Sequence, residues 1–357
     1  MLKKFKTKQA GVFGGCILAT TSYHSQAVLF YATADPSYNA TAPAGALAGS
    51  GWQYQGEWGG FSGTAIAPHY FISAQHIGGS VGQVFQWNNL PFTTINYFDD
   101  PSSDLRIWQV QEAFPSFAPL FSLGNEVGKS LVVIGRGTQR GPAVVVTGAV
   151  HGWQPGQYDG IQRWGQNVVA STTSNKQGGD LLTATFDANA GPNEADLSEG
   201  DSGGAVFIQD GATWKLAGIN YAVDGNYNDS PTGAGFAADL FDYGGLYTGQ
   251  EGAWTYNLDL PTPQPGSFYA TRISVRNDWI NSILAMPLPQ PAVTLQIAIT
   301  PAGSYSTDVN ATVDTAGQVI TTTLPAQSSA FFQISGPTAV RITSVKQVGG
   351  QLQISYQ

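Results

Sequence analysis

Short runs in which apolar and polar residues alternate make up much of this chain, and this spacing predicts β-strands. One set of runs occupies residues 52–128 and a second set occupies residues 130–274, with Gly, Pro and Asn between the runs. Short strands interrupted in this way favour an all-β body with one set of strands in each range.

One segment has helical spacing instead. Residues 274–285 start at Ser274, which can cap a helix, and their Ile and Leu residues fall on one apolar face. Prolines follow and end this helix, so residues 286–292 are expected to form a stiff linker.

Residues 293–357 follow the linker and alternate again, with many Thr, Ser, Val and Gln residues. They predict a small separate β module. This module contains no His and no Cys, so its sequence leaves three roles open: a spacer, a surface-binding module or a tail used in export.

Residues 1–27 have the pattern of a signal peptide. Four lysines precede an apolar run, and the segment ends in the small residues of a cleavage site after Ala27. We therefore expect a secreted or periplasmic protein. The apolar run is too short to span a bilayer, so no stable membrane insertion is expected. Lipid attachment to Cys16 is the weaker alternative, because the residues before it match a lipoprotein signal poorly.

The remaining chain is acidic. Removing residues 1–27 takes away four lysines and no acid, which moves the formal net charge from −9 to −13, so nucleic acid is not an expected partner. Cys16 is the only cysteine and leaves with the signal peptide, so the exported chain would have no disulfide. We expect a monomer in which residues 28–51, rich in Asp, Pro, Asn and Gly, form an arm over the barrel.

The segment 200–204 reads Gly-Asp-Ser-Gly-Gly, a tight turn around Ser202. In such a turn the backbone N–H groups of Gly200 and Ser202 can point at one spot, where an attacked carbonyl oxygen would become negatively charged. The turn therefore predicts a nucleophilic serine beside an oxyanion hole. A simple surface turn is the alternative in a chain with 44 glycines, so the motif needs partners elsewhere.

His76 is the predicted general base. It ends an apolar run over residues 64–76, and its imidazole can accept and return a proton near neutral pH. His69, which follows a proline, and His151, in a loop with Gly, Trp, Gln and Pro, are the alternatives.

Asp104 is the predicted partner of His76. It directly precedes an alternating run over residues 105–110, where an acid can be partly buried, accept the second N–H of the histidine and fix its tautomer. Asp99 and Asp100 are the alternatives, and their place in an Asp-Asp-Pro-Ser-Ser turn indicates solvated acids.

The chain order His76, Asp104, Ser202, with Ser-Ala-Gln-His at the histidine and Asp-Leu-Arg-Ile at the acid, resembles the trypsin-like (chymotrypsin-fold) serine proteases, in particular secreted bacterial members. The resemblance covers roughly residues 51–285. It implies two six-stranded antiparallel β-barrels of chymotrypsin type and a closing C-terminal helix. It also implies that these three residues form a catalytic triad, that the substrate is a protein or peptide, and that no cofactor is needed.

Members of this family carry an acid directly before the nucleophile, here Asp201. A buried carboxylate requires a cation. Animal relatives supply a freshly cut Ile-Val-Gly-Gly terminus, which this sequence lacks. Arg136, in a Gly-Arg-Gly turn, is the expected partner, because some bacterial relatives use an internal arginine. The α-amino group that signal cleavage would create at Val28 is the alternative.

The resemblance also implies a substrate pocket. In the family, the residue six before the nucleophile lies at the base of this pocket, and here it is Asp196, which implies cleavage after Arg or Lys. An exposed acid in an acidic loop is the alternative. Asn220, Tyr221 and Ala222 correspond to the edge strand that binds the substrate.

No metal is expected. Residues 224–229 are similar to a calcium loop in their oxygen ligands, but the glycine and the bidentate acid of such a loop are missing. The histidines lack the paired spacing of a zinc site.

Together these patterns predict a secreted serine endopeptidase. Two other possibilities stay open. One is a binding or adhesion protein on a catalytically silent barrel, and the other is a narrow processing protease held latent by its N-terminal arm.

Overall fold

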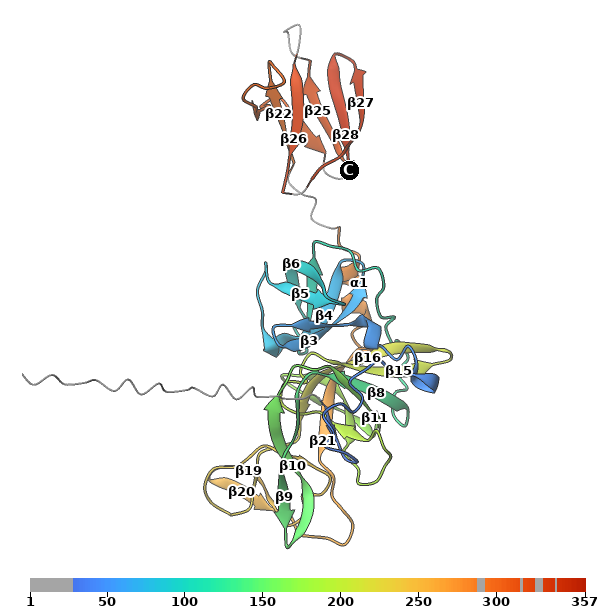
Figure 1. Cartoon of the computed structure of the whole chain (residues 1–357), viewed down its shortest axis with the longest axis vertical. Coiled ribbons are helices and arrows are strands. Elements are labelled where there is room, and N and C mark those ends of the chain that lie inside the picture. Colours follow the sequence, from blue (N-terminus) through green and yellow to red (C-terminus); the bar gives the residue numbers. More distant parts are fainter. Residues whose placement is uncertain (1–27, 288–292, 315–316, 325–329, 338) are drawn as a thin grey trace, which may run out of the picture. The chain divides into compact units, whose positions relative to one another are not determined.

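The computed structural model describes residues 28–287, 293–314, 317–324, 330–337 and 339–357. The predicted signal peptide and most of the predicted linker lie outside these residues. The chain divides after Leu284 into two compact units, which we describe separately (Figure 1).

The first unit contains a closed barrel of six strands in the order β2-β3-β4-β7-β6-β5. Aromatic side chains fill its interior: Trp58, Phe71, Phe85 and Trp108 are at most 1% exposed, and the rings of Phe71 and Phe85 stack with centroids 4.1 Å apart. The expected first barrel is therefore present. Its strands are Gln55–Trp58 (β2), Phe61–Ala67 (β3), Tyr70–Ala74 (β4), Val84–Trp87 (β5), Leu90–Asp99 (β6) and Leu105–Val110 (β7).

The second half of this unit is a seven-stranded antiparallel sheet in the order β11-β8-β15-β16-β21-β13-β12, where a closed six-stranded barrel was expected. The all-β, chymotrypsin-like fold is confirmed, and the difference lies in which strands join the sheet. Its strands are Ser130–Gly135 (β8), Arg163–Val168 (β11), Ser171–Asn175 (β12), Gly179–Thr185 (β13), Ala205–Asp210 (β15), Thr213–Val223 (β16) and Ser267–Arg272 (β21).

Two long strands leave this sheet and explain the difference. β9 (Thr138–Val146) and β10 (Ala149–Tyr158) pair with each other, and β10 also pairs with β18 (Asp239–Leu240). A second small sheet is inserted between β16 and β21. It consists of β17 (Tyr227–Asn228), β19 (Tyr247–Gln250) and β20 (Ala253–Tyr256).

The N-terminal arm begins inside the core of the second half. Val28 and Phe30 belong to its hydrophobic cluster, and β1 (Leu29–Phe30) pairs with β14 (Ala195–Asp196). The expectation that the whole arm lies over the barrel is therefore wrong for its first residues, because apolar side chains at the start of the arm are better buried than exposed.

The closing helix α1 spans Asn277–Leu284 and buries Ile280 and Ile283. It begins later than the sequence predicted, because Ser274 does not cap it. The Ser274 hydroxyl donates instead to the carboxylate of Glu126, which also binds the guanidinium of Arg272. No helix within the described residues is long and apolar enough to cross a membrane.

The second unit is entirely β in its described parts and has a small core that includes Leu295, Ile320 and Ile354. Two sheets form it, in the orders β23-β22-β26 and β24-β25-β28-β27. The strands are Thr294–Ala298 (β22), Ser306–Thr307 (β23), Thr312–Asp314 (β24), Val319–Thr323 (β25), Phe331–Ser335 (β26), Ile342–Val348 (β27) and Gln351–Tyr356 (β28).

Candidate active site

Strand pairing in the first barrel brings His76 and Asp104 together. β4 and β7 are antiparallel, with Ala74 opposite Leu105, so the residues just beyond these ends of the strands become neighbours. His76 lies in a short 3-10 turn after β4, and its Nδ1 lies 2.6 Å from Oδ2 of Asp104. The other carboxylate oxygen accepts the backbone N–H of His76 at 3.0 Å. Two contacts therefore fix the imidazole orientation.

Ser202 reaches the same imidazole from the second half of the unit. Its Oγ lies 2.8 Å from Nε2 of His76. The side chain of His76 is 41% exposed and that of Asp104 is 8% exposed, so the acid is shielded while the base opens to solvent. The structure thus brings together three side chains that are far apart along the chain.

Glycines shape the turn around Ser202. Gly200 and Gly203 have φ angles of +94° and +74°, which L-residues with a side chain rarely adopt. A Cβ on Gly203 would also lie only 2.4 Å from the backbone oxygen of Ser62. Within the described residues, the backbone N–H groups of Gly200 and Ser202 have no hydrogen-bond acceptor, as an oxyanion hole requires.

The predicted ion pair between Asp201 and Arg136 is wrong. The buried Asp201 carboxylate instead accepts three backbone N–H groups, those of Gly137 at 2.7 Å, Ser198 at 2.8 Å and Val28 at 3.3 Å. Burial raises the pKa of Asp201 to about 7, although these hydrogen bonds oppose the rise.

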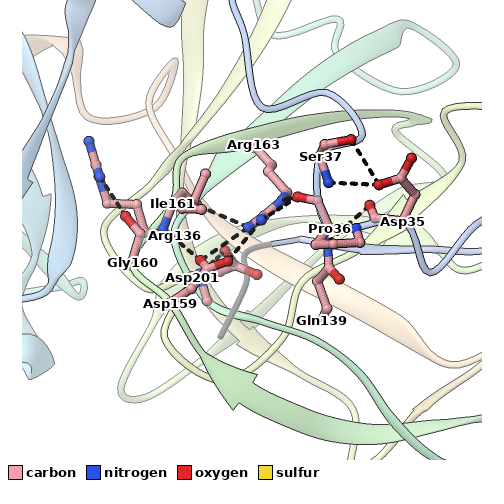
Figure 2. Close-up of polar contacts among 11 residues, drawn as sticks. Asp35, Pro36, Ser37, Arg136, Gln139, Asp159, Gly160, Ile161, Arg163 and Asp201 are labelled. Carbon is pink, nitrogen blue, oxygen red and sulfur yellow. Dashed lines mark hydrogen bonds and ion pairs between the residues drawn. The ribbon is translucent and has the colours of Figure 1, made fainter. Parts of the chain in front are cut away.

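Arg136 points away from Asp201 and donates to the backbone oxygen of Gly160 (Figure 2). It also donates to Oε1 of Gln162. The two glycines that flank this arginine, rather than the arginine itself, lie against the Asp201 carboxylate. A Cβ on Gly135 or Gly137 would lie 2.0 Å from Oδ1 or 2.7 Å from Cγ of Asp201, so only glycine lets the backbone approach the acid.

A pocket of about 380 Å³ opens beside the three side chains and is lined by both His76 and Ser202. The predicted residues Asn220, Tyr221 and Ala222 line it too. Asn220 is fully buried and holds the turn, since its Nδ2 donates to the backbone oxygens of Ile134 and Asp201.

Asp196, the acid predicted at the pocket base, is not among the residues that line this pocket. It is 1% exposed, lies in β14 opposite Leu29, and its Oδ1 accepts the backbone N–H of Leu197. Asp239 of β18 lines the pocket instead. Its Oδ2 is buried and has no hydrogen-bond partner among the described residues.

Burial raises the pKa of both acids, and the nearby charge of Asp239 raises the pKa of Asp196 further. No local sequence pattern indicates Asp239, because its position depends on the pairing of β18 with β10, more than 80 residues earlier in the chain.

The residues that the sequence offers as alternatives to His76 and Asp104 make other contacts. The ring of His69 contacts the backbone oxygen of Val110. The carboxylate of Asp99 forms an ion pair with Arg106, and that of Asp100 accepts hydrogen bonds from the hydroxyl groups of Ser102 and Ser103. In the loop similar to a calcium site, the Asp224 carboxylate accepts the Ser267 N–H and the Tyr269 hydroxyl, which gives it a structural role.

Comparison with known proteins identifies the family of this chain. The family model described as Trypsin matches residues 46–243. No curated protein matches the chain. Among solved structures, neuropsin, a serine protease expressed in the limbic system of mouse brain, is similar at 14% identity and a TM-score of 0.44, over 66% of this chain and 96% of that one. Because the family model covers more than half of the sequence, the chain belongs to the trypsin-like serine protease family.

Proposed function

We propose that this protein is an exported serine endopeptidase in which Ser202, His76 and Asp104 act as the catalytic triad. One observation carries the proposal: Nε2 of His76 lies 2.8 Å from Oγ of Ser202 while Nδ1 lies 2.6 Å from Asp104. This chain of contacts allows a proton to leave the serine hydroxyl as the hydroxyl attacks.

In the proposed reaction, Oγ of Ser202 attacks the carbonyl carbon of the scissile peptide and passes its proton to His76. The resulting oxyanion accepts the N–H groups of Gly200 and Ser202. His76 then protonates the leaving amine, which departs and leaves an acyl-enzyme. A water gives a proton to His76, attacks the ester and releases the acid product, and the serine recovers its proton. Asp104 orients the imidazole and stabilises its charged form throughout.

We further propose that the substrate carries Arg or Lys before the scissile bond. Asp239 supports this, because it lines the pocket with an unpaired buried oxygen. Asp196, predicted for this role from the sequence, does not line the pocket and would contribute through its charge next to Asp239. A cationic side chain in the pocket would supply positive charge to both buried acids and a hydrogen-bond donor to Oδ2 of Asp239.

Export would also switch the enzyme on. Cleavage after Ala27 would convert the amide nitrogen of Val28 into an α-ammonium group next to Asp201, and the buried carboxylate would gain a cation. This α-amino group is the partner that the sequence offers for Asp201 besides Arg136. The Gly200–Ser202 turn would then be held open in the secreted or periplasmic protein, which we expect to act as a monomer.

A fluorophosphonate probe tests the proposal, since it labels only an activated serine. Protein that begins at Val28 should be labelled and should cleave members of a peptide library, whereas Ser202→Ala should do neither. Ser116→Ala, at an exposed serine, serves as the control and should behave as the parent does. A folded protein that neither takes the label nor cleaves any peptide would instead be the catalytically silent binding protein.

A further inference from the structure

Three side chains from separate segments meet in the second half of the protease unit, and none of them lines the pocket beside Ser202. His151 lies on β10, Asp242 follows β18 and Asp259 lies in the loop after β20. Each offers one possible ligand atom, and these three atoms lie within 4.8 Å of one another. We propose that His151, Asp242 and Asp259 bind a divalent cation of the zinc class.

The backbone around Asp242 holds its carboxylate in position for such a role. Oδ1 accepts the backbone N–H groups of Gly244 at 2.9 Å and Gln264 at 3.1 Å. Oδ2 accepts neither of these N–H groups and lies 3.8 Å from Nδ1 of His151. A ligand whose second oxygen is fixed by N–H groups is pre-oriented in the way that partners around metal ligands usually provide.

Glycine brings the third ligand close. A Cβ on Gly244 would lie 3.0 Å from Oδ1 of Asp242 and 3.2 Å from Cα of Asp259. Because Gly244 has no side chain, the exposed segment that carries Asp259 can pack against the Asp242 turn. The site would therefore have two shielded ligands and one ligand at the surface, with room for water to complete the coordination.

The charges in this cluster are not balanced by the protein. The side chains of His151 and Asp242 are 7% and 12% exposed. Across the described residues, neither Asp242 nor Asp259 forms an ion pair with Lys or Arg. The shielded carboxylate of Asp242 is costly without a cation, and a bound metal would supply positive charge to it and to the exposed Asp259.

The ligand types select the class of metal. One imidazole with two carboxylates suits zinc better than calcium, which takes oxygen ligands only. Zinc bonds of about 2.0–2.2 Å place tetrahedral ligands roughly 3.3–3.6 Å apart. Nδ1 of His151 lies 3.8 Å from Oδ2 of Asp242, close to this range, and 3.1 Å from the backbone oxygen of Asp242. Metal binding through Nδ1 would replace the contact with that oxygen, so a small rotation of the imidazole completes the site.

The position of the cluster suggests what the metal does. Ala237, Ala238 and Asp239 line the substrate pocket, and Asp242 comes three residues later. The backbone N–H of Asp242 donates to the oxygen of His151, next to the pairing of β18 with β10. A metal here would join the inserted segment to β10 and hold that wall of the pocket, in a chain whose only cysteine is Cys16.

Metal binding can be tested without catalysis. We would use protein that begins at Val28 and carries Ser202→Ala, strip it with EDTA and titrate it with Zn²⁺. The expected result is about one bound equivalent and a rise in Tm of about 5 °C at a hundredfold excess over the dissociation constant. Asp259→Asn, an exposed change that leaves the core intact, should weaken zinc binding at least tenfold, and His151→Gln should weaken it further.

Asp229→Asn is the matched control, since it removes an exposed acid from the same inserted segment and should bind zinc as the parent does. Binding below a tenth of an equivalent with no change in Tm would overturn the proposal. Equal zinc binding by Asp259→Asn, His151→Gln and the parent would also overturn it, because the ion would then lie elsewhere. Preference for Ca²⁺ over Zn²⁺ would overturn the assigned class. None of these results depends on whether Ser202 is a nucleophile.

Discussion

The backbone nitrogen of Val28 lies 3.3 Å from Oδ2 of Asp201, the residue directly before Ser202. Val28 and Leu29 are fully buried, and Asp201 is 1% exposed. Val28 therefore lies against the acid that supports the turn of the proposed nucleophile. A change in the charge of that nitrogen would act one residue away from the reacting hydroxyl.

We predict that the length of the N-terminus controls activity. Protein that begins at Val28 should react with a fluorophosphonate probe faster than protein that keeps Ala27, because only the former places an α-ammonium group beside Asp201. In the shorter protein, Asp201→Asn should lower stability by about 3–5 kcal/mol, since it leaves a buried charge unpaired. Equal labelling rates for the two N-termini would contradict the predicted role of Val28.

A buried arginine anchors the arm that carries Val28. Arg163 is fully buried, and its guanidinium donates to the backbone oxygen of Pro36 at 2.5 and 3.0 Å and to the carboxylate of Asp159 at 2.8 Å (Figure 2). Arg163→Met should cost about 3–5 kcal/mol in urea unfolding, because the shielded Asp159 loses its cation. Lys215→Met removes the more exposed pair with Asp210 and should cost at most about 1 kcal/mol. Equal costs would contradict the anchoring role.

The site residues that depend on local sequence patterns could be predicted from the sequence. His76 follows one apolar run and Asp104 precedes another, and antiparallel pairing of β4 with β7 places these two ends side by side. Ser202 was predicted from its own glycine-rich turn. The partner of Asp201 could not be predicted in this way, because its hydrogen bonds come from backbone N–H groups, which carry no residue signal. The Gly-Arg-Gly turn was recognised, but its glycines, rather than its arginine, contact the acid.

Contacts between segments that are distant along the chain could not be predicted from the sequence either. Asp239 and the cluster of His151, Asp242 and Asp259 depend on the pairing of β10 with β18, and β10 was expected to belong to the second barrel. Where an insertion pairs with a distant strand, strand patterns alone give neither the partner nor the register. The second half was predicted as a closed barrel for the same reason.

Stability should fall as the pH rises from about 4.5 to about 8. Burial raises the pKa of Glu194 to about 8, so the folded protein holds a proton that the unfolded chain releases above its ordinary pKa of 4.5. The raised pKa of Asp201 also lowers stability as the pH rises, provided that the nitrogen of Val28 is an uncharged amide. In the Ser202→Ala protein, Glu194→Gln should flatten the decline by at most about 1.4 kcal/mol per pH unit. Melting curves between pH 4 and pH 9 measure this.

Glu251→Gln, at an exposed position, is the control for this experiment and should leave the pH profile of Tm unchanged. A Tm that rises with pH over the same range, or a Glu194→Gln variant with an unaltered profile, would show that Glu194 is ionised in the folded protein.

We predict that Asp239 selects the substrate. Asp239→Asn should lower kcat/KM for Arg and Lys substrates roughly tenfold to a hundredfold, because a charge-assisted hydrogen bond of about 1.5–3 kcal/mol is lost. A substrate with an apolar residue before the scissile bond should be cleaved as well as before, or better. Asp196→Ala should shift the profile in the same direction. An unchanged ratio of basic to apolar cleavage in both variants would reject the assignment, with Asp229→Asn as the control.

The acid of the proposed triad can be separated from its neighbours in the same loop. Asp104→Asn should lower kcat about 10⁴-fold at neutral pH. The amide oxygen would keep the backbone N–H of His76, and the amide nitrogen would donate to Nδ1, which holds the imidazole in the unreactive tautomer. Asp100→Asn removes an equally buried acid, one that binds Ser102, Ser103 and Arg276, and should reduce stability while leaving kcat within a few-fold of the parent. Steady-state kinetics on one peptide ester, with circular dichroism to confirm folding, compares the two. A comparable loss of kcat in both variants would mean that the loop as a whole supports His76 and that Asp104 has no special role in orienting it.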